Sequence, residues 1–146
     1  MEDKKFEFSQ NVAVFRTSKL LNVESDELTN SEVSFLMVIY NMPKPVNSVM
    51  VSKFFDCTKV YVCKVVGILV DGGYVTKTVS QKDRRAFNLE LTEKGLKFVK
   101  DYMDKYIEII SYLYDQLGEE KANQLNELLK QANVLIKNKS NGLKNK

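Results

Sequence analysis

The 146-residue sequence contains no histidine and no tryptophan, and only two cysteines, two prolines and six glycines. Histidine is the side chain most often used as a general base near neutral pH and as a metal ligand, so its absence argues against both kinds of site. The sequence also lacks a glycine-rich phosphate loop, a Cys/His metal spacing and a Gly-x-Ser-x-Gly motif. Acidic residues are plentiful, but none forms a recognisable pair in an apolar setting. We therefore predict a protein that is not an enzyme, with no catalytic residue, metal ion or cofactor.

Long apolar runs are also missing. No segment approaches the roughly 18–20 apolar residues that a membrane span requires, and the N-terminal MEDKKFEF has no apolar core of a secretory signal. Cys57 and Cys63 are too few for a disulfide framework, which is typical of a reducing compartment. We therefore expect a cytoplasmic protein without a membrane partner, in which both cysteines are most simply small buried hydrophobes.

Positive charge is unevenly distributed along the chain. Hydrophobic residues make up 44% and charged residues 28% of the sequence, and the net charge is only +3, as in an ordinary globular protein that forms a single domain over 1–146. Residues 44–97, however, carry ten Lys/Arg against five Asp/Glu, whereas the remainder carries 12 basic and 14 acidic residues. This segregation favours a module that faces a polyanion, with an ordinary solvated surface as the alternative.

Two helices are expected in the first part of the chain. Residues 4–22 place their large apolar residues near helical spacing. Residues 30–41 form the next predicted helix, with Thr29 as its N-cap and Glu32 at the capping-box spacing. A segment with two prolines then ends this helix.

A pair of short helices follows. Residues 46–55 and 59–71 are expected to be helical and are joined by a connection that ends in Thr58, which can cap the second helix. That helix has an apolar face with i, i+3, i+4, i+7 spacing, made by Val62, Val65, Val66 and Leu69. The pair has the geometry of a helix-turn-helix.

The rest of the chain combines a hairpin with two longer helices. The expected elements are strands over 74–79 and 86–91 around a tip at 80–85, helices over 93–117 and 119–137, and a flexible tail over 138–146. The helix over 93–117 is apolar on more than one side, so a partner chain is its natural cover. The predicted fold is mainly α with a small β-hairpin wing: a winged helix-turn-helix DNA-binding module over 28–92, with 4–22 and 93–137 as a helical dimerisation region.

Two surfaces of this module carry side chains suited to DNA. At the hairpin tip, the carboxylate of Asp83 can hold one arginine in a bidentate pair while the wing places an arginine in the minor groove. The first turns of the helix over 59–71 supply phosphate donors and base-edge contacts. The candidate DNA-binding residues are Thr58, Lys59, Tyr61, Lys64, Lys82, Arg84 and Arg85. A hairpin tip that is charged only for solubility is the alternative.

The string Asp83-Arg84-Arg85-Ala86, followed by Leu91-Thr92-Glu93-Lys94-Gly95, resembles the D-x-R…LTxxG wing signature of the MarR family of transcriptional regulators. The order of elements is similar over nearly the whole chain. The resemblance implies a homodimeric winged-helix protein that binds a palindromic operator and often answers to a small ligand or an oxidant. It also implies that Asp83 orients Arg85, that Arg85 enters the minor groove, and that the helix from Lys59 is the recognition helix.

Departures from the family pattern concern specificity and sensing. Tyr61 and Cys63 stand on the recognition helix where many relatives have small polar residues, so the resemblance does not imply an operator sequence. Relatives that sense oxidants commonly carry their thiol in the first helix, where this chain has none. Cys57 falls at a turn position that is usually apolar, so we expect it in the core. Cys63 is the candidate for a redox-sensitive thiol, because oxidation there would interfere with DNA contact.

Related dimers often bind aromatic effectors between the dimerisation region and the DNA-binding module. The resemblance therefore implies a ligand crevice here, with a small aromatic effector as its ligand and Phe15, Tyr40, Tyr102 and Tyr106 as its lining. Ordinary packing of an aromatic cluster is the alternative. The overall prediction is a homodimeric repressor that binds double-stranded DNA at an inverted-repeat operator. The alternative from another class is a winged-helix protein-interaction module, or anti-regulator, that does not read DNA sequence.

Overall fold

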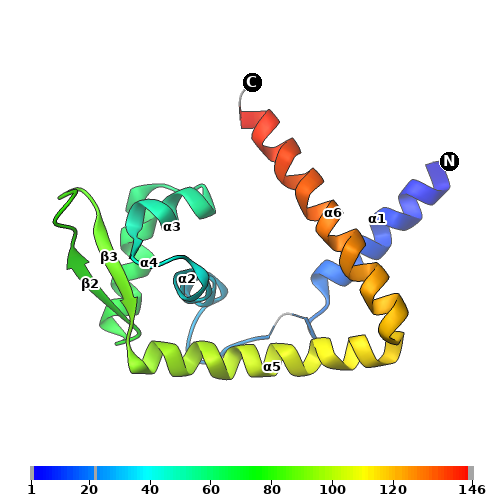
Figure 1. Ribbon diagram of the computed structural model, residues 1–146, viewed down its shortest axis with the longest axis horizontal. Helices are drawn as coiled ribbons and strands as arrows, with labels where there is room; N and C mark the ends of the chain where they lie inside the picture. The colour runs from blue at the N-terminus through cyan, green and yellow to red at the C-terminus, as the bar shows by residue number, and fades with distance from the viewer. Residues whose placement is uncertain (1, 22, 145–146) are drawn as a thin grey trace. The chain divides into compact units, whose positions relative to one another are not determined.

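The computed structural model describes residues 2–21 and 23–144 (Figure 1). The chain groups into two compact units, Met1–Tyr106 and Ile107–Lys146, and each is treated by itself below. The elements follow in the order α1 (Glu2–Thr17), α2 (Asn30–Asn41), β1 (Val46–Asn47), α3 (Ser48–Phe55), α4 (Lys59–Asp71), β2 (Val75–Val79), β3 (Phe87–Leu91), α5 (Glu93–Leu117) and α6 (Glu119–Lys144). The predicted mainly α fold with a hairpin wing is confirmed, whereas a single domain over 1–146 stays a prediction.

The core of the first unit lies between α2, α3, α4 and the small sheet. Phe35 of α2 is buried, and its ring stacks on Phe55 of α3 with the ring centroids 4.6 Å apart. The side chains that are almost completely buried include Phe35, Leu36, Ile39, Val51, Val62, Val66, Leu69, Leu89 and Val99. The apolar stripe that the sequence predicted on α4 is therefore the face packed into this core, which leaves the opposite face in solvent.

Side-chain caps fix where the helices of this module begin. Thr29 and Glu32 form the predicted capping box at the start of α2. The Thr58 hydroxyl oxygen accepts a hydrogen bond of 3.2 Å from the Tyr61 amide at the start of α4. The predicted bounds of α2 and α4 are confirmed, because each cap stands one residue before its helix. The glycine pair after α4 ends it with Gly73 in the left-handed region, at a φ of 78°.

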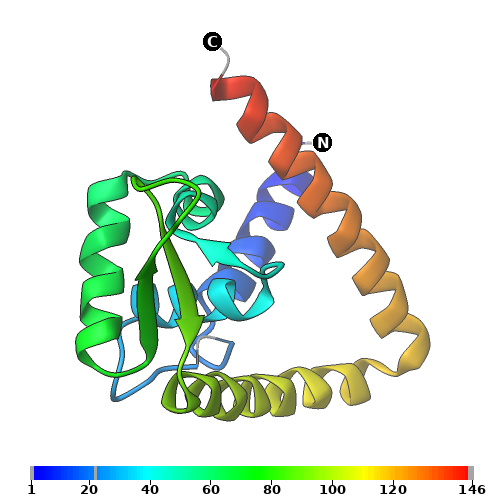
Figure 2. The same ribbon diagram turned by 60° about the vertical axis from the view of Figure 1, so that its left-hand side comes forward.

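The sheet has three antiparallel strands in the order β1-β3-β2 (Figure 2). The sequence prediction missed β1, since the expected helix over 46–55 begins only at Ser48. Val46 pairs instead with Leu89, and the Asn47 side chain accepts a hydrogen bond of 2.9 Å from the Met50 amide. A strand of two residues is too short to show an alternating pattern, so it exists only because β3 lies beside it.

The junction between β3 and α5 explains the LTEKG string. The Thr92 hydroxyl donates to the Gly73 carbonyl oxygen at 2.6 Å and accepts from the Gly95 amide at 3.0 Å. The Lys94 ammonium donates to the Gly72 carbonyl oxygen at 2.7 Å. A Cβ atom on Gly95 would lie 2.0 Å from the carbonyl oxygen of Tyr74. This string therefore ties the start of α5 to the end of α4 and the entry of the wing.

The remaining helices expose large apolar side chains. Helix α1 has no buried residue, and its exposed residues include Phe6, Phe8, Val12, Val14 and Phe15. It ends at Thr17, earlier than predicted, and the expected end at Asn22 lies outside the described residues. In the second unit α6 continues to Lys144, so the predicted tail is helical over 138–144, and 145–146 lie outside the described residues. The polar segment has no proline, so nothing interrupts the helical hydrogen-bond ladder there.

Candidate nucleic-acid interface

The tip between β2 and β3 is an exposed turn held by its own backbone. The last pair of the hairpin is Val79 with Phe87, and the Ser80 amide donates to the Ala86 carbonyl oxygen at 3.2 Å. The Asp83 carboxylate accepts a hydrogen bond of 2.9 Å from the Arg85 amide, and the Asp83 carbonyl oxygen accepts one of 3.0 Å from the Ala86 amide. Aspartate closing such a turn is a common way to fix a tight loop.

This geometry corrects the predicted role of Asp83 as the salt-bridge support of the wing. The carboxylate holds the main chain of Arg85 rather than a guanidinium group. Among the described residues the ion pairs are Lys97–Asp101 and Lys130–Glu127, neither of which lies in the wing. The local turn places the carboxylate over the amide two residues on, so the Arg85 side chain is left exposed to solvent. Asp83 therefore orients the residue but leaves the guanidinium free for an external anion.

The solvent face of α4 presents several of the predicted contacts. Thr58, Lys59 and Lys64 are exposed, as are Val60 and Cys63. Val60 is 79% exposed, whereas Tyr61 is only 39% exposed because its ring packs edge-on against Phe35, with the centroids 6.0 Å apart. Tyr61, which was predicted to contact DNA, therefore packs partly against the core. Val60 in the first turn of α4 is the more accessible side chain.

Lys59 connects the two predicted DNA-facing surfaces. Its ammonium donates a hydrogen bond of 2.5 Å to the carbonyl oxygen of Arg85. Figure 2 shows α4 beside the hairpin, with the first turn of α4 at the same end as the tip. No sequence signal could reveal this contact, because it joins residues 26 positions apart.

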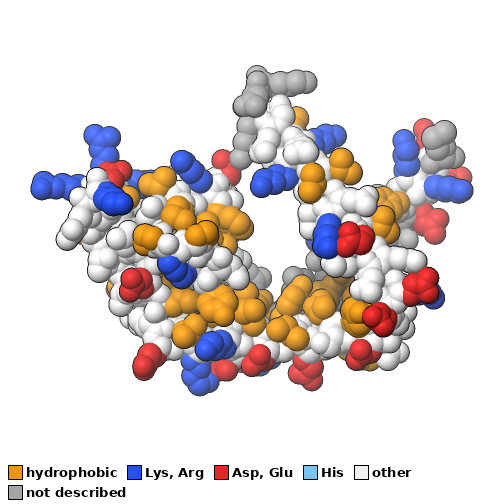
Figure 3. Space-filling view, in the orientation of Figure 1, with side chains coloured by type: hydrophobic (Ala, Val, Ile, Leu, Met, Phe, Trp, Pro, Cys, Tyr) orange, Lys and Arg blue, Asp and Glu red, His pale blue; other side chains and the backbone are white. Residues whose placement is uncertain are grey.

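The structure brings the predicted DNA contacts to one end of the module. Lys82, Arg84 and Arg85 are all exposed at the tip, and Figure 3 shows Lys and Arg side chains gathered over the end of the wing. The Lys59–Arg85 bond places the start of α4 next to this group. A helix start with exposed hydroxyl and ammonium groups, beside a basic hairpin tip, can bind phosphates and reach base edges in adjacent grooves.

The predicted ligand crevice is only partly present. A crevice of about 190 Å³ lies between the segment 23–27 and α5, lined on the α5 side by Phe98, Asp101, Tyr102 and Lys105. Of the four predicted lining residues, only Tyr102 contributes. Phe15, Tyr40 and Tyr106 are not among its lining residues: Tyr40 packs against the core, and the other two are exposed. Burial, with a smaller contribution from Tyr106, raises the pKa of Tyr102.

One wall of this crevice is connected to the wing. The Tyr74 hydroxyl, just before β2, donates a hydrogen bond of 2.8 Å to the carboxylate of Glu27, which lines the crevice. That hydrogen bond, together with burial and the charge of the carboxylate, raises the pKa of Tyr74. Tyr74 therefore stays a neutral donor near neutral pH, and a change at Glu27 acts directly on the residue from which the wing starts.

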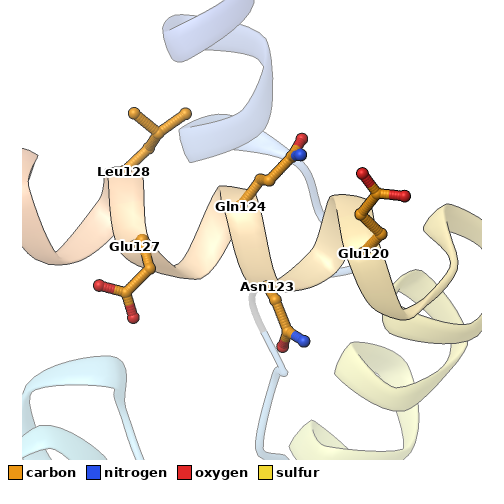
Figure 4. Close-up of a pocket in the computed structure, with 5 residues that line it drawn as sticks. All are labelled: Glu120, Asn123, Gln124, Glu127 and Leu128. Atoms are coloured by element: carbon orange, nitrogen blue, oxygen red, sulfur yellow. The ribbon is translucent and has the colours of Figure 1, made fainter.

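A second depression lies on α6. Its lining residues are Glu120, Asn123, Gln124, Glu127 and Leu128 (Figure 4). All five come from one helix, so the depression lacks the converging walls of a small-molecule site.

The expectation that both cysteines are buried holds in part for Cys57 and is wrong for Cys63, which lies on the solvent face of α4. Cys57 is half-buried against the core, and Cys63 is exposed. In the part of the chain that the structure describes, no cluster of His, Cys, Asp or Glu is arranged to hold a metal ion. Within the same residues no helix has both the length and the apolar character needed to cross a membrane.

Residues 28–95 match the family of winged helix DNA-binding domains. A search of curated proteins found no match. The structural likeness extends over nearly the whole chain. A MarR transcriptional regulator from Methanosarcina mazei superposes with a TM-score of 0.72 at 23% identity, covering 97% of this chain and 99% of that one.

Two DNA complexes are also similar to the chain. They are FabT of Streptococcus pneumoniae, with a TM-score of 0.70 at 22% identity over 94% of this chain and 95% of that one, and MepR of S. aureus, with a TM-score of 0.64 at 20% identity over 93% and 98%. The fold indicated by the wing signature is thus confirmed: residues 28–95 are similar to winged helix DNA-binding domains, and the chain has the fold of the MarR-type transcriptional regulators.

Proposed function

We propose that this winged-helix, MarR-type DNA-binding regulator acts in the cytoplasm as a homodimeric repressor on an inverted-repeat operator. The observation that carries the proposal is the juxtaposition of the exposed first turn of α4 with the basic wing tip, joined by the Lys59–Arg85 hydrogen bond. In this arrangement α4 reads the major groove and the wing enters the neighbouring minor groove. The DNA complexes of FabT and MepR, which share the fold, support this assignment.

The exposed helices support a homodimer. Helix α1 buries none of its residues, and α6 exposes Leu128, Leu135 and Ile136 along one side. Apolar stripes of this kind are the usual mark of a surface covered by another chain. A twofold dimer would set two α4 helices about 34–36 Å apart, in successive major grooves of a palindromic site.

The direct test is binding of the full chain to duplex DNA from upstream of its own gene, measured by fluorescence anisotropy at several salt concentrations. We expect a selective complex whose affinity falls steeply with salt, because several Lys and Arg side chains displace counterions from phosphates. Equal binding to the upstream duplex and to a scrambled duplex would contradict the proposal and favour the protein-interaction module.

Replacing Arg85 with alanine is expected to weaken operator binding by about tenfold to a hundredfold without changing the melting temperature. The side chain is exposed and the turn is held by the main chain, so its loss removes a DNA contact and not a folding contact. The same anisotropy titration and a thermal melt measure the two quantities. Arg16→Ala is the matched control, because it removes an exposed arginine from α1. Normal binding by the Arg85 variant would remove the wing tip from the contact surface.

An effector site is proposed at the crevice between residues 23–27 and α5. The stacked rings of Phe98 and Tyr102, with centroids 6.3 Å apart, offer an aromatic wall, and Glu27 links the opposite wall to the wing through Tyr74. We expect a small aromatic compound to weaken DNA binding, and we expect Tyr102→Ala to lower the sensitivity to that compound by about tenfold. A panel of aromatic acids and amines, titrated into the DNA complex, checks this. A compound that acts equally on both forms places its site elsewhere.

A further inference from the structure

The backbone of Arg85 is held on both sides. Its amide donates to the carboxylate of Asp83 at 2.9 Å, and its carbonyl oxygen accepts from the ammonium of Lys59 at 2.5 Å. The first contact comes from the turn itself and the second from the start of α4. The guanidinium group takes part in neither, so the two contacts determine where the Arg85 side chain begins.

Few other contacts anchor the tip. Residues 81–85 are all exposed, and the hairpin ladder ends at the pair Val79 and Phe87. The next tertiary hydrogen bond along β3 is buried, from the Phe87 amide to the Ser48 hydroxyl oxygen at 3.3 Å. Among the described residues, Lys59 makes the only side-chain hydrogen bond between α4 and the tip. Without it the tip is held by local turn contacts alone, and such turns open readily.

The position of Lys59 is informative in itself. It is the first residue of α4, where the partial positive charge of the helix end disfavours a cation. A carbonyl oxygen within hydrogen-bond reach offsets this cost, and a charge-assisted bond of this kind is among the stronger hydrogen bonds in proteins. The lysine therefore has a structural partner before any DNA arrives.

We propose that Lys59 is a positioning residue that fixes the wing relative to the recognition helix, so that Arg85 enters the minor groove while α4 occupies the major groove. This inference rests on the proposed DNA-binding function. It assigns Lys59 a role different from that of Lys64, which is exposed on the same helix and whose predicted task is a phosphate contact. Lys59 acts through Arg85, whereas Lys64 acts on DNA directly.

The first arm of the test needs no DNA. Trypsin cleavage after Arg84 and Arg85 in the full-length protein is followed by mass spectrometry. We expect Lys59→Met to speed this cleavage by about fivefold, the effect of losing one hydrogen bond on a local opening equilibrium. Lys59→Arg should restore the slow rate, because it keeps a cationic donor, and Lys64→Met should leave the rate unchanged. Equal rates for the wild type and Lys59→Met would overturn the proposal.

The second arm is a double-mutant cycle on the upstream duplex. Lys59→Met alone should weaken binding by about fivefold to tenfold. In the Arg85→Ala background the same substitution should change affinity by less than twofold, since the residue that it positions is already gone. Lys64→Met should weaken both backgrounds equally and lower the salt slope by about one.

The outcomes separate the two proposals. Additive losses for Lys59→Met and Arg85→Ala would make Lys59 a direct DNA contact and overturn the positioning role. A wild-type protein that binds no duplex selectively would contradict the proposed function, while the cleavage rates still decide whether Lys59 fixes the wing.

Discussion

Replacing Gly95 with alanine is expected to lower the free energy of unfolding by about 3 kcal/mol, at the upper end of the usual cost of overpacking. A Cβ atom there would lie 2.0 Å from the carbonyl oxygen of Tyr74, and that oxygen belongs to the backbone and cannot rotate away. The same carbonyl accepts the Thr92 amide at 3.0 Å, so any displacement also disturbs the junction of β3 with α5. Urea unfolding followed by circular dichroism measures the change.

Gly67→Ala is the matched control for this experiment. Gly67 lies within α4, and a Cβ atom there meets nothing within 4 Å. In a helix interior alanine is favoured over glycine by about 1 kcal/mol, so this variant should be slightly more stable than the wild type. If Gly95→Ala unfolded at the same urea concentration as the wild type, the result would contradict the close packing of α5 against the entry of the wing.

Replacing Leu135 with glutamate is expected to convert the proposed dimer into monomers. Leu135 is 69% exposed on α6, on the stripe that also carries Leu128 and Ile136. If a partner chain covers this stripe, the substitution buries an unpaired charge twice, once from each protomer. An unpaired buried charge costs about 3–5 kcal/mol, which is more than a hundredfold in the dissociation constant. Sedimentation velocity over a range of protein concentrations measures the change.

Val134→Glu is the matched control for the dimer. Val134 immediately precedes Leu135 and is 58% exposed. At about 100° per residue it lies on the other side of Leu135 from Ile136, about 160° from Ile136 around the helix, and so it points away from the stripe. We expect it to leave the dimer intact. The Leu135 variant should also bind the two half-sites of an operator independently. If the Leu135→Glu variant remained a dimer, α6 would not lie in the interface, and something other than the partner chain would have to cover the apolar stripe.

Much of the fold was predictable because its signals are local. Thr29 with Glu32, and Thr58, marked helix starts that the structure reproduces, since a cap depends only on residues within one turn. The two strands around the tip at 80–85 were predicted in the same way, from residues that are near one another in the sequence. The strand β1 was missed because it is held by pairing with Leu89, 43 positions from Val46. The helical end of α6 was missed because polar composition was taken for disorder.

In the candidate site, too, some features follow from local sequence signals and others from tertiary contacts. The sequence by itself indicated the candidate DNA-facing side chains, because the basic residues at the tip and the polar start of α4 follow from hairpin position and helix phase. Only the tertiary structure decided how they are held. The Asp83 carboxylate accepts a hydrogen bond from the Arg85 amide and holds no guanidinium group. The Tyr61 ring packs partly against the core, and the Lys59 ammonium donates to the Arg85 carbonyl oxygen in the wing. The Tyr61 and Lys59 contacts join segments that are distant in sequence, and sequence spacing carries no information about such contacts. The Asp83 contact is local, but only the folded turn decides whether the carboxylate meets the amide or a guanidinium group.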